Sequence, residues 1–355
     1  MATSPVPYSR PTTPGNAVPI QIGYVGLGGM GGTMARNLAK YHATHAHNSP
    51  PMLVWNRSSV KGEKLLAELG QDKIRVARSL DQVATECDII FTSLANDEAV
   101  KSVYQQFAET LKVLMCHPRG TKIFVESSTT FPTLAGELEM LISSAPHCRL
   151  ITCPVFGTPP VAEAAQLIVV MSGDHQSKKE VAPMLVPAVG RKIIDLGESL
   201  EKAPTFKLIG NSMVLGTLEI LAESYTLAEK AGVAASDVHS FVQEMFPAPG
   251  IIRYSERISQ DDFDASTGFS IDGGIKDASH IRRLTALHNS PMPCTDIAHQ
   301  HLITARAIHK SKVQSGKETV DVFDWSSLVT GARAAAGLDV FASARVRLLP
   351  LAAYG

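Results

Sequence analysis

The sequence lacks several features that would mark particular classes of protein. Its 33 Lys and Arg residues are balanced by 34 Asp and Glu residues, which gives a formal net charge of -1. Because binding to a phosphate backbone requires a basic field, we expect no nucleic-acid partner. No apolar run approaches the roughly 20 residues that span a bilayer, so we expect no membrane partner. With 355 residues, 45% of them hydrophobic, the chain is long enough for two globular domains.

Cysteine is scarce, and its pattern does not indicate a disulfide framework. The five cysteines form no CxxC pair, and an odd number cannot close completely into disulfides. This favours a reducing, cytoplasmic location. Residues 1–19 contain five prolines and Arg10 as their only basic residue, so they resemble neither a signal peptide nor a transit peptide. We expect these residues to form a disordered tail.

Histidines cluster once, but not in a pattern typical of a metal site. His42, His45 and His47 lie in the polar stretch 41–51, which contains no cysteine and no carboxylate. We interpret this stretch as a solvated loop before the second strand, and we predict no metal site.

The chain does contain a regular alternation of β-branched runs and helical stretches up to about residue 194. This pattern predicts an α/β Rossmann domain with a doubly wound parallel sheet over residues 20–200. From Pro204 onward the strand pattern stops, and apolar residues follow helical spacing. We therefore expect an all-helical domain over 201–330 and a C-terminal extension over 331–355. The expected strands are 22–25, 53–55, 89–92, 123–126, 167–171 and 192–194.

The first helix of the second domain is predicted to be unusually long. About 27 residues at 1.5 Å each would span roughly 40 Å, more than one small domain covers. We expect this helix to join the two domains and to contribute to an interface between copies. A homodimer or a dimer of dimers is therefore predicted.

A glycine-rich segment follows the first expected strand directly. In GLGGMG, residues 26–31, Gly26 permits the tight turn and Gly28 lets the backbone approach a pyrophosphate. Gly31 allows a helix to pack closely on the strand, and the amino end of that helix faces the phosphates. A strand, this turn and a helix together predict a dinucleotide-binding loop. We expect cofactor contacts from Gly26, Leu27, Gly28, Met30 and Gly31.

The residues after the second expected strand bear on the choice of cofactor. NAD-binding folds place an acidic residue there, which binds the 2′-hydroxyl of the ribose. This chain has Asn56, Arg57 and Ser58 instead. A guanidinium beside hydroxyl groups suits a 2′-phosphate, through charge-assisted hydrogen bonds. We therefore expect all three residues to bind NADP, and NADPH to be the cofactor.

These segments resemble a known superfamily. The stretch GYVGLGGMGGTMARNL, residues 23–38, is similar to the opening fingerprint of the β-hydroxyacid dehydrogenases. These include 3-hydroxyisobutyrate dehydrogenases, 6-phosphogluconate dehydrogenases and glyoxylate/succinic semialdehyde reductases. The resemblance continues through TSLAND (92–97), ESST (126–129) and CPVFGT (153–158), and ends near residue 326. Residues 56–58 and 159–167 look most like the NADPH-using glyoxylate/succinic semialdehyde reductases.

The resemblance implies a redox enzyme with a catalytic lysine. Lys207 and Asn211 match a lysine and an asparagine of the interdomain helix, and their spacing puts both on one helix face. Lys207 would give a proton to the carbonyl during reduction and take it back during oxidation, while Asn211 orients the substrate. Pro204 suits a first helical position, which would put Lys207 in the first turn. There the helix dipole and burial would both lower the pKa of the lysine.

The resemblance also implies further contacts. Ser128 and Thr129 match a pair whose hydroxyls bind the substrate and the nicotinamide edge, respectively, and Leu94 lies in a matched segment expected to contact the cofactor. Lys276 and Asp277 match a pair beside the nicotinamide. We expect Lys276 to contact the cofactor and Asp277 to pair with Lys276.

The chain departs from the family pattern around the expected substrate. The family's Ser-Gly-Gly loop is here Phe156, Gly157 and Thr158, of which we expect Gly157 and Thr158 to contact the substrate. Phenylalanine removes a hydroxyl group and adds a large apolar surface. If Phe156 lines the pocket, small hydrophilic hydroxyacids should be poor substrates and more apolar carbonyl compounds better ones. The glycine-rich turn that precedes the catalytic lysine in the family is also changed, to GESLEKAP at 197–204.

Two other functions stay open beside carbonyl reduction. One is C=N reduction, as in imine reductases, which resemble this superfamily but commonly have another residue at the lysine position. The other is a non-catalytic NADP-binding scaffold, in which loss of the proton donor would be expected. Because Lys207 is present, the sequence favours NADPH-dependent interconversion of an aldehyde or ketoacid and the corresponding alcohol or hydroxyacid.

We predict that the protein binds NADPH more tightly than NADH, because Arg57 takes the place of a ribose-binding carboxylate and Ser58 adds a hydroxyl. The dissociation constants of the two cofactors, measured by fluorescence titration, test this. Equal binding of both would refute it.

Overall fold

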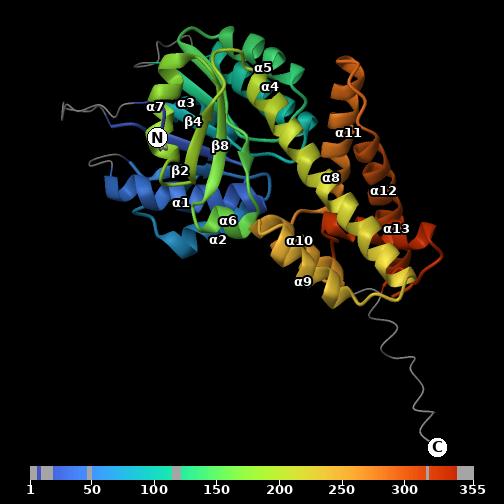
Figure 1. Ribbon diagram of the computed structural model, residues 1–355. Helices are drawn as coiled ribbons and strands as arrows, with labels where there is room; N and C mark the ends of the chain where they lie inside the picture. The colour runs from blue at the N-terminus through green and yellow to red at the C-terminus, as the bar shows by residue number, and fades with distance from the viewer. Residues whose placement is uncertain (1–5, 9–18, 46–49, 114–120, 317–319, 342–355) are drawn as a thin grey trace, which may run out of the picture. The chain divides into compact units, whose positions relative to one another are not determined.

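The computed structural model describes residues 6–8, 19–45, 50–113, 121–316 and 320–341. The chain divides into two compact units, Met1–Lys207 and Leu208–Gly355. In the described residues, strands alternate with helices in the first unit, and the second unit contains helices with two isolated β-bridges (Figure 1). The predicted fold class, a Rossmann domain followed by a helical domain, is confirmed.

The first unit is built on a nine-stranded sheet. Its order is β3-β2-β1-β4-β5-β6-β8-β7, with β9 also paired to β8. The strands from β3 to β6 are parallel, whereas β8 runs antiparallel to β6 and β7. The strands are β1 (Ile22–Val25), β2 (Met52–Trp55), β3 (Ile74–Val76), β4 (Ile89–Thr92), β5 (Lys122–Glu126), β6 (Cys148–Thr152), β7 (Val155–Phe156), β8 (Leu167–Gly173) and β9 (Gly190–Asp195).

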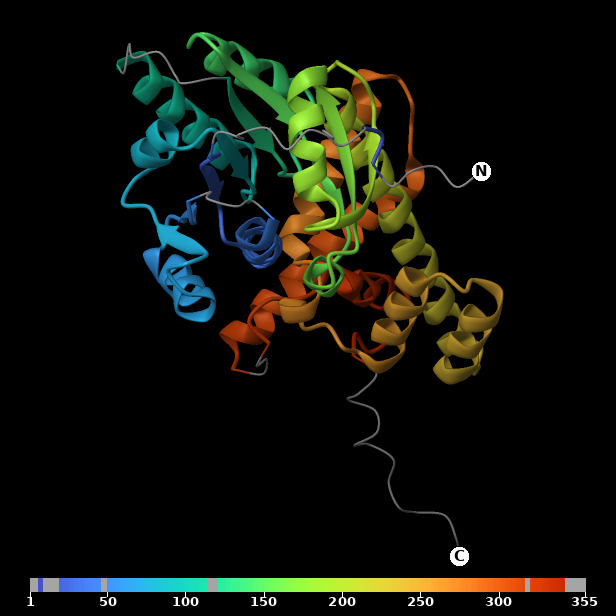
Figure 2. The ribbon, with the colours of Figure 1, turned by 90° about the vertical axis from the view of Figure 1, so that its left-hand side faces the viewer.

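Helices cover both faces of this sheet, which explains why its central strands are buried and mostly apolar. Alternate residues of each strand belong to two separate cores. Tyr24 and Phe91 pack with α1, α2 and α7, whereas Val25 and Ile90 pack with α3, α4 and α5. In Figure 2 the strands of this unit run between flanking helices. These helices are α1 (Gly29–His45), α2 (Ser59–Leu69), α3 (Leu80–Glu86), α4 (Asp97–Val113), α5 (Thr133–Ser143), α6 (Pro159–Glu163) and α7 (His175–Leu185).

The polar stretch after residue 40 is helical rather than looped up to His45. Residues 41–45 form the last turns of α1, so the loop prediction was wrong for them. His42 is buried, and the His45 ring stacks on the Tyr41 ring with centroids 4.0 Å apart. One histidine is thus buried in the helix and the other stacks on a tyrosine, while His47 lies outside the described residues.

The long helix α8 (Lys202–Lys230) contains the boundary between the units and begins earlier than predicted. Its first turn is fixed by the sheet: Ser172 Oγ accepts from the Ala203 N–H at 3.1 Å, and the Thr152 hydroxyl donates to the Leu200 carbonyl at 2.8 Å. Lys207 therefore lies in the second turn. The prediction that it lies in the first turn was wrong, and the dipole effect argued from that position weakens beyond the first turn.

The second unit packs around the remainder of α8. Leu215, Leu218 and Ala222 form a core with the helices that follow. α13 is buried against this core, although the sequence assigned most of it to a C-terminal extension; residues 342–355 lie outside the described part. The helices are α9 (Ala235–Met245), α10 (Pro249–Gln260), α11 (Ile271–Leu287), α12 (Pro293–Gln314), α13 (Val329–Ala335) and the short 3₁₀ helices η1 (Ala265–Thr267) and η2 (Trp325–Leu328).

Part of the expected N-terminal tail contacts the first unit. Val6 and Tyr8 pack against its core, and the Tyr8 hydroxyl donates to the Asp195 carboxylate. Residues 1–5 and 9–18 lie outside the described part. Among the helices that are described, none combines the length and apolarity needed to cross a membrane.

Candidate active site

The glycine loop lies where the strand order of the sheet reverses, between β1 and β4. In open α/β sheets such switch points form a crevice at the carboxyl ends of the strands. Gly26 has φ +98°, and a Cβ on it would lie 2.1 Å from the Ser93 carbonyl oxygen. A Cβ on Gly31 would lie 2.2 Å from the Gly26 carbonyl oxygen. Glycine is therefore required at both positions, by the backbone and by close packing of α1 on the strand.

The rest of the loop leaves room for a dinucleotide. Gly28 and Gly29 are exposed, and a Cβ on either would meet no atom within 4 Å. α1 begins at Gly29 and has no acidic residue in its first turn, so its unpaired N–H groups favour an anion. Leu27 is buried and Met30 half-buried beneath the loop. The residues present thus fit the pyrophosphate of a nicotinamide cofactor.

Asn56 supports the loop from the end of β2. Its Oδ1 accepts from the Leu27 N–H at 2.9 Å, and its Nδ2 donates to the Ser58 carbonyl at 3.0 Å. Its side chain thus acts on the protein backbone in two directions; its contact with the cofactor stays a prediction. Arg57 is exposed beside it, and the Ser58 hydroxyl makes no capping bond to α2.

Ser128 and Leu94 come together at the ends of β5 and β4. The Leu94 N–H donates to Ser128 Oγ at 2.8 Å, and Ser128 is buried. Thr129 is half-buried next to it, on the same loop. The structure therefore links one residue predicted to contact the substrate with one predicted to contact the cofactor. No local sequence pattern indicates this bond, which joins residues 34 positions apart.

Lys207 is held on an aromatic surface. Its Nζ lies 4.4 Å from the centre of the Phe156 ring, and only 9% of the residue is exposed. The Phe156 ring packs edge-to-face on the Phe206 ring, with centroids 6.1 Å apart. A cation over a ring face gains about 0.5 to 2 kcal/mol, more when water is excluded. The role of Phe206 in this arrangement was missed because the contact depends on where β7 lies relative to α8.

Gly157 and Thr158 follow Phe156 at the start of α6. Gly157 has φ +143°, and a Cβ there would lie 2.4 Å from Leu167 Cδ2. Packing and backbone conformation therefore already account for this glycine, and its predicted substrate contact stays a prediction. Thr158 is the N-cap residue of α6, but its side chain makes no capping bond.

In the second unit, Asp277 joins the two residues that the sequence placed near the substrate and the nicotinamide. It is buried, accepts from Asn211 Nδ2 at 2.6 Å through Oδ2, and pairs with Lys276 Nζ at 3.1 Å through Oδ1. The expected pairing with Lys276 is thus present, but the bond to Asn211 was missed. Asp277 fixes the orientation of the Asn211 amide.

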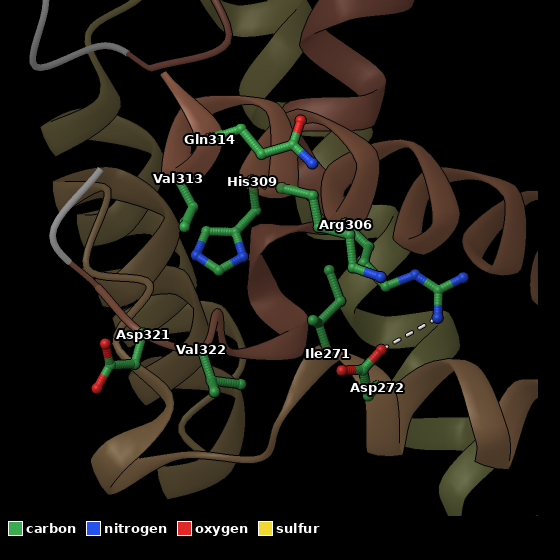
Figure 3. Close-up of a pocket in the computed structure, with 9 residues that line it drawn as sticks. Ile271, Asp272, Arg306, His309, Val313, Gln314, Asp321 and Val322 are labelled. Atoms are coloured by element: carbon green, nitrogen blue, oxygen red, sulfur yellow. Dashed lines mark hydrogen bonds and ion pairs between the residues drawn. The ribbon is translucent and has the colours of Figure 1, made fainter. Parts of the chain in front are cut away.

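A separate pocket of about 280 Å³ lies in the second unit, between α12 and the start of α11 (Figure 3). Arg306 spans its edge and pairs with Asp272 at 3.0 Å. His309 of α12 also lines the pocket, and its Nε2 lies 2.8 Å from the Val320 carbonyl oxygen. None of the predicted site residues lines this pocket, so it is not the site described above.

Comparison with known sequences agrees with the motifs at the glycine loop. Residues 21–197 match the family model described as the NAD binding domain of 6-phosphogluconate dehydrogenase. The chain belongs to the β-hydroxyacid dehydrogenase superfamily. It is a member of an oxidoreductase superfamily, and its first unit is an NAD(P)-binding domain. The NADH-dependent oxidoreductase ucdB of Aspergillus ustus is 28% identical over 274 residues, 77% of this chain and 88% of that protein.

Solved structures share the fold of this superfamily member. The 3-hydroxyisobutyrate dehydrogenase of Mycobacterium tuberculosis, solved with L-serine, has a TM-score of 0.68 at 23% identity, over 89% of this chain and all of that one. A reductive aminase of Aspergillus terreus, solved with NADPH and ethyl levulinate, has a TM-score of 0.51 at 18% identity, over 88% of this chain and 99% of that one.

Proposed function

We propose that this protein is an NADPH-dependent oxidoreductase that interconverts a carbonyl compound and the corresponding alcohol, with Lys207 as the general acid and base. The observation that carries the proposal is the position of Lys207. The ammonium group is nearly buried on the Phe156 ring, whereas most helix lysines are solvated. It belongs to the same unit as the glycine loop. A lysine withdrawn from water beside a dinucleotide fold suits proton transfer.

The proposed chemistry divides between the cofactor and the chain. NADPH, when bound, supplies the hydride. Lys207 gives a proton to the carbonyl oxygen during reduction and takes one from the hydroxyl group during oxidation. Asn211, one turn further along α8 and oriented by Asp277, would hydrogen-bond the substrate. Ser128 and Thr158 would supply further hydroxyl contacts.

The proposed preference for NADPH is supported by the end of β2. Arg57 is exposed there. Its side chain forms neither an ion pair nor a hydrogen bond with the residues that the structure describes. The Ser58 hydroxyl is not used to cap α2, so it is also available to a 2′-phosphate. One relative is named an NADH-dependent oxidoreductase. The measured dissociation constants of NADPH and NADH therefore decide whether this preference holds.

The proposed substrate is an aldehyde or ketoacid with an apolar substituent. Its support is Phe156, whose ring lies against Lys207. In the family's loop, a serine hydroxyl and neighbouring backbone donors receive a substrate carboxylate. An aromatic ring offers no such donor and favours apolar surface instead.

A homodimer, or a dimer of dimers, is part of this proposal. Four large apolar residues of α8 are exposed at spacings of four and seven: Ile209, Met213, Ile220 and Leu227. This is the spacing of a helical seam, and a second copy of the chain would cover it.

We also propose a cytoplasmic location, which is supported by free thiols at Cys87, Cys148, Cys153 and Cys294.

Substitution of Lys207 tests the reaction itself. Lys207→Met should lower kcat by at least about 100-fold and leave the affinity for NADPH nearly unchanged, as expected for a missing general acid. The measurement is NADPH oxidation against a panel of aldehydes, ketoacids and cyclic imines. Lys202→Met, at an exposed position of the same helix, is the matched control. Retained turnover in Lys207→Met would show that another group donates the proton. A cyclic imine as the best substrate would show that the enzyme reduces C=N rather than C=O bonds.

Substitution of Phe156 tests the substrate class. The wild type should have a higher kcat/KM for an aryl aldehyde than for glyoxylate or succinic semialdehyde. Phe156→Ser should shift this ratio toward the small carboxylates by roughly 10- to 150-fold, the value of one hydrogen bond to a charged group. Phe156→Leu removes the ring without adding a hydroxyl and should not produce the shift. A wild type that is already efficient with glyoxylate, and is not improved by serine, contradicts the idea.

Light scattering at micromolar concentration tests the oligomer. The wild type should have at least twice the mass of the chain, because the exposed face of α8 needs a cover. Changing both Ile220 and Leu227 to Glu should shift the protein to monomers, since two charges would be buried at the seam. Met140→Glu, at an exposed apolar position on α5, should not. A monomeric wild type rules out the proposed dimer.

A further inference from the structure

A buried carboxyl group lies directly beneath Ser128. Glu126 is the last residue of β5, and it is 2% exposed. One of its oxygens, Oε1, accepts the Ser128 N–H at 2.6 Å. Ser128 in turn accepts the Leu94 N–H at 2.8 Å. A continuous set of bonds thus runs from the carboxyl group of Glu126 to the backbone of Leu94.

The carboxyl group is itself fixed from the other side. Its Oε2 accepts from the Thr92 hydroxyl at 2.5 Å, and Thr92 Oγ1 lies 3.1 Å from the Tyr104 hydroxyl. Thr92 ends β4, and Tyr104 is a fully buried residue of α4. Both strand ends and one helix therefore determine where the carboxyl group lies, which leaves it little freedom to follow a movement of the loop.

Such a group is costly to bury, so its presence calls for a reason. Burial raises the pKa of Glu126, and hydrogen bonds from Ser128 and Thr92 act in the opposite direction. An apolar side chain would avoid the desolvation cost, but it would leave the Ser128 N–H without its acceptor. What the carboxyl group provides is a fixed position for the β5–α5 loop.

We propose that Glu126 is a positioning residue, which sets the places of Ser128 and Leu94 for the substrate and the cofactor. This inference rests on the proposed function, in which those two residues make the contacts. Glu126 acts only through Ser128. Without its acceptor, the Ser128 backbone relaxes, the Ser128 hydroxyl leaves the Leu94 N–H, and the β4–α4 loop loses its support beside the cofactor.

The test is a double-mutant cycle on NADPH affinity, which requires no turnover. Glu126→Met keeps the length of the side chain and removes its polar atoms, and should raise the dissociation constant of NADPH about 10-fold. In a Ser128→Ala background, the same substitution should change it by less than about twofold, because the connection is already broken. With a carbonyl substrate, KM should rise by a larger factor than kcat falls.

Two further variants separate positioning from general stability. Glu126→Gln keeps an acceptor for the Ser128 N–H and should recover most of the affinity lost in Glu126→Met. Ser177→Ala removes a buried hydroxyl of α7 that bonds to Asp174 rather than to Glu126 or Ser128. It should lower the melting temperature while leaving the NADPH affinity unchanged. If Glu126→Met does not fold, Glu126→Leu, which also removes both carboxyl oxygens, replaces it in the cycle with the same expected coupling.

The inference is overturned if Glu126→Met binds NADPH like the wild type, or if it has an equal effect with and without the Ser128 hydroxyl. It is also overturned if Ser177→Ala weakens NADPH binding as much as Glu126→Met does. A wild type that binds NADPH but reduces no carbonyl compound contradicts only the proposed function. The role of Glu126 is still decided by the double-mutant cycle on NADPH affinity.

Discussion

The architecture of the first unit depends on the close contact of the glycine loop with neighbouring backbone, at the carboxyl ends of β1 and β4. Gly26 approaches the Ser93 carbonyl so closely that no side chain fits, and Gly31 approaches the Gly26 carbonyl in the same way. These contacts bring the amino end of α1 to the edge of the sheet. There its N–H groups have no helical acceptors and can bind an anion. A larger residue at either position would move the helix away from the strand end.

Around this contact, the loops of three strands are held by side chains that the cofactor need not touch. Asn56 bonds to the glycine loop from β2, and Ser128 bonds to the β4 loop from β5. Glu126 supports Ser128 from below. A site built in this way has its geometry fixed before a ligand arrives, which reduces the entropy lost on binding. In the second unit, Asp277 likewise orients a residue that is predicted to contact the ligand, Asn211.

The surroundings of Lys207 distinguish this chain from the family pattern on which the site was predicted. An aromatic ring lies beneath the ammonium group where the family has a serine loop. A ring can hold a cation through its face while offering no hydrogen bond to a carboxylate. The lysine is thus compatible with the chemistry of the superfamily, whereas the ring beside it offers a ligand no hydrogen-bond donor.

The sequence by itself determined the elements whose patterns are local. The strands at residues 22–25 and 89–92 were predicted with the bounds the structure gives them, because each is a continuous apolar run buried on both faces. The glycine loop and the i, i+4 spacing of Lys207 and Asn211 could likewise be read directly, since they depend on residues close in the chain.

Only the tertiary structure decided the rest. β3 and β6 were missed because their short, partly polar runs become strands through the neighbours that pair with them. The start of α8 was misplaced because its cap is Ser172, which is contributed by a strand. The contacts of Phe156 with Lys207, and of Glu126 with Thr92, join residues far apart in the chain. No local pattern reports such pairs, since the packing of strands and helices brings them together.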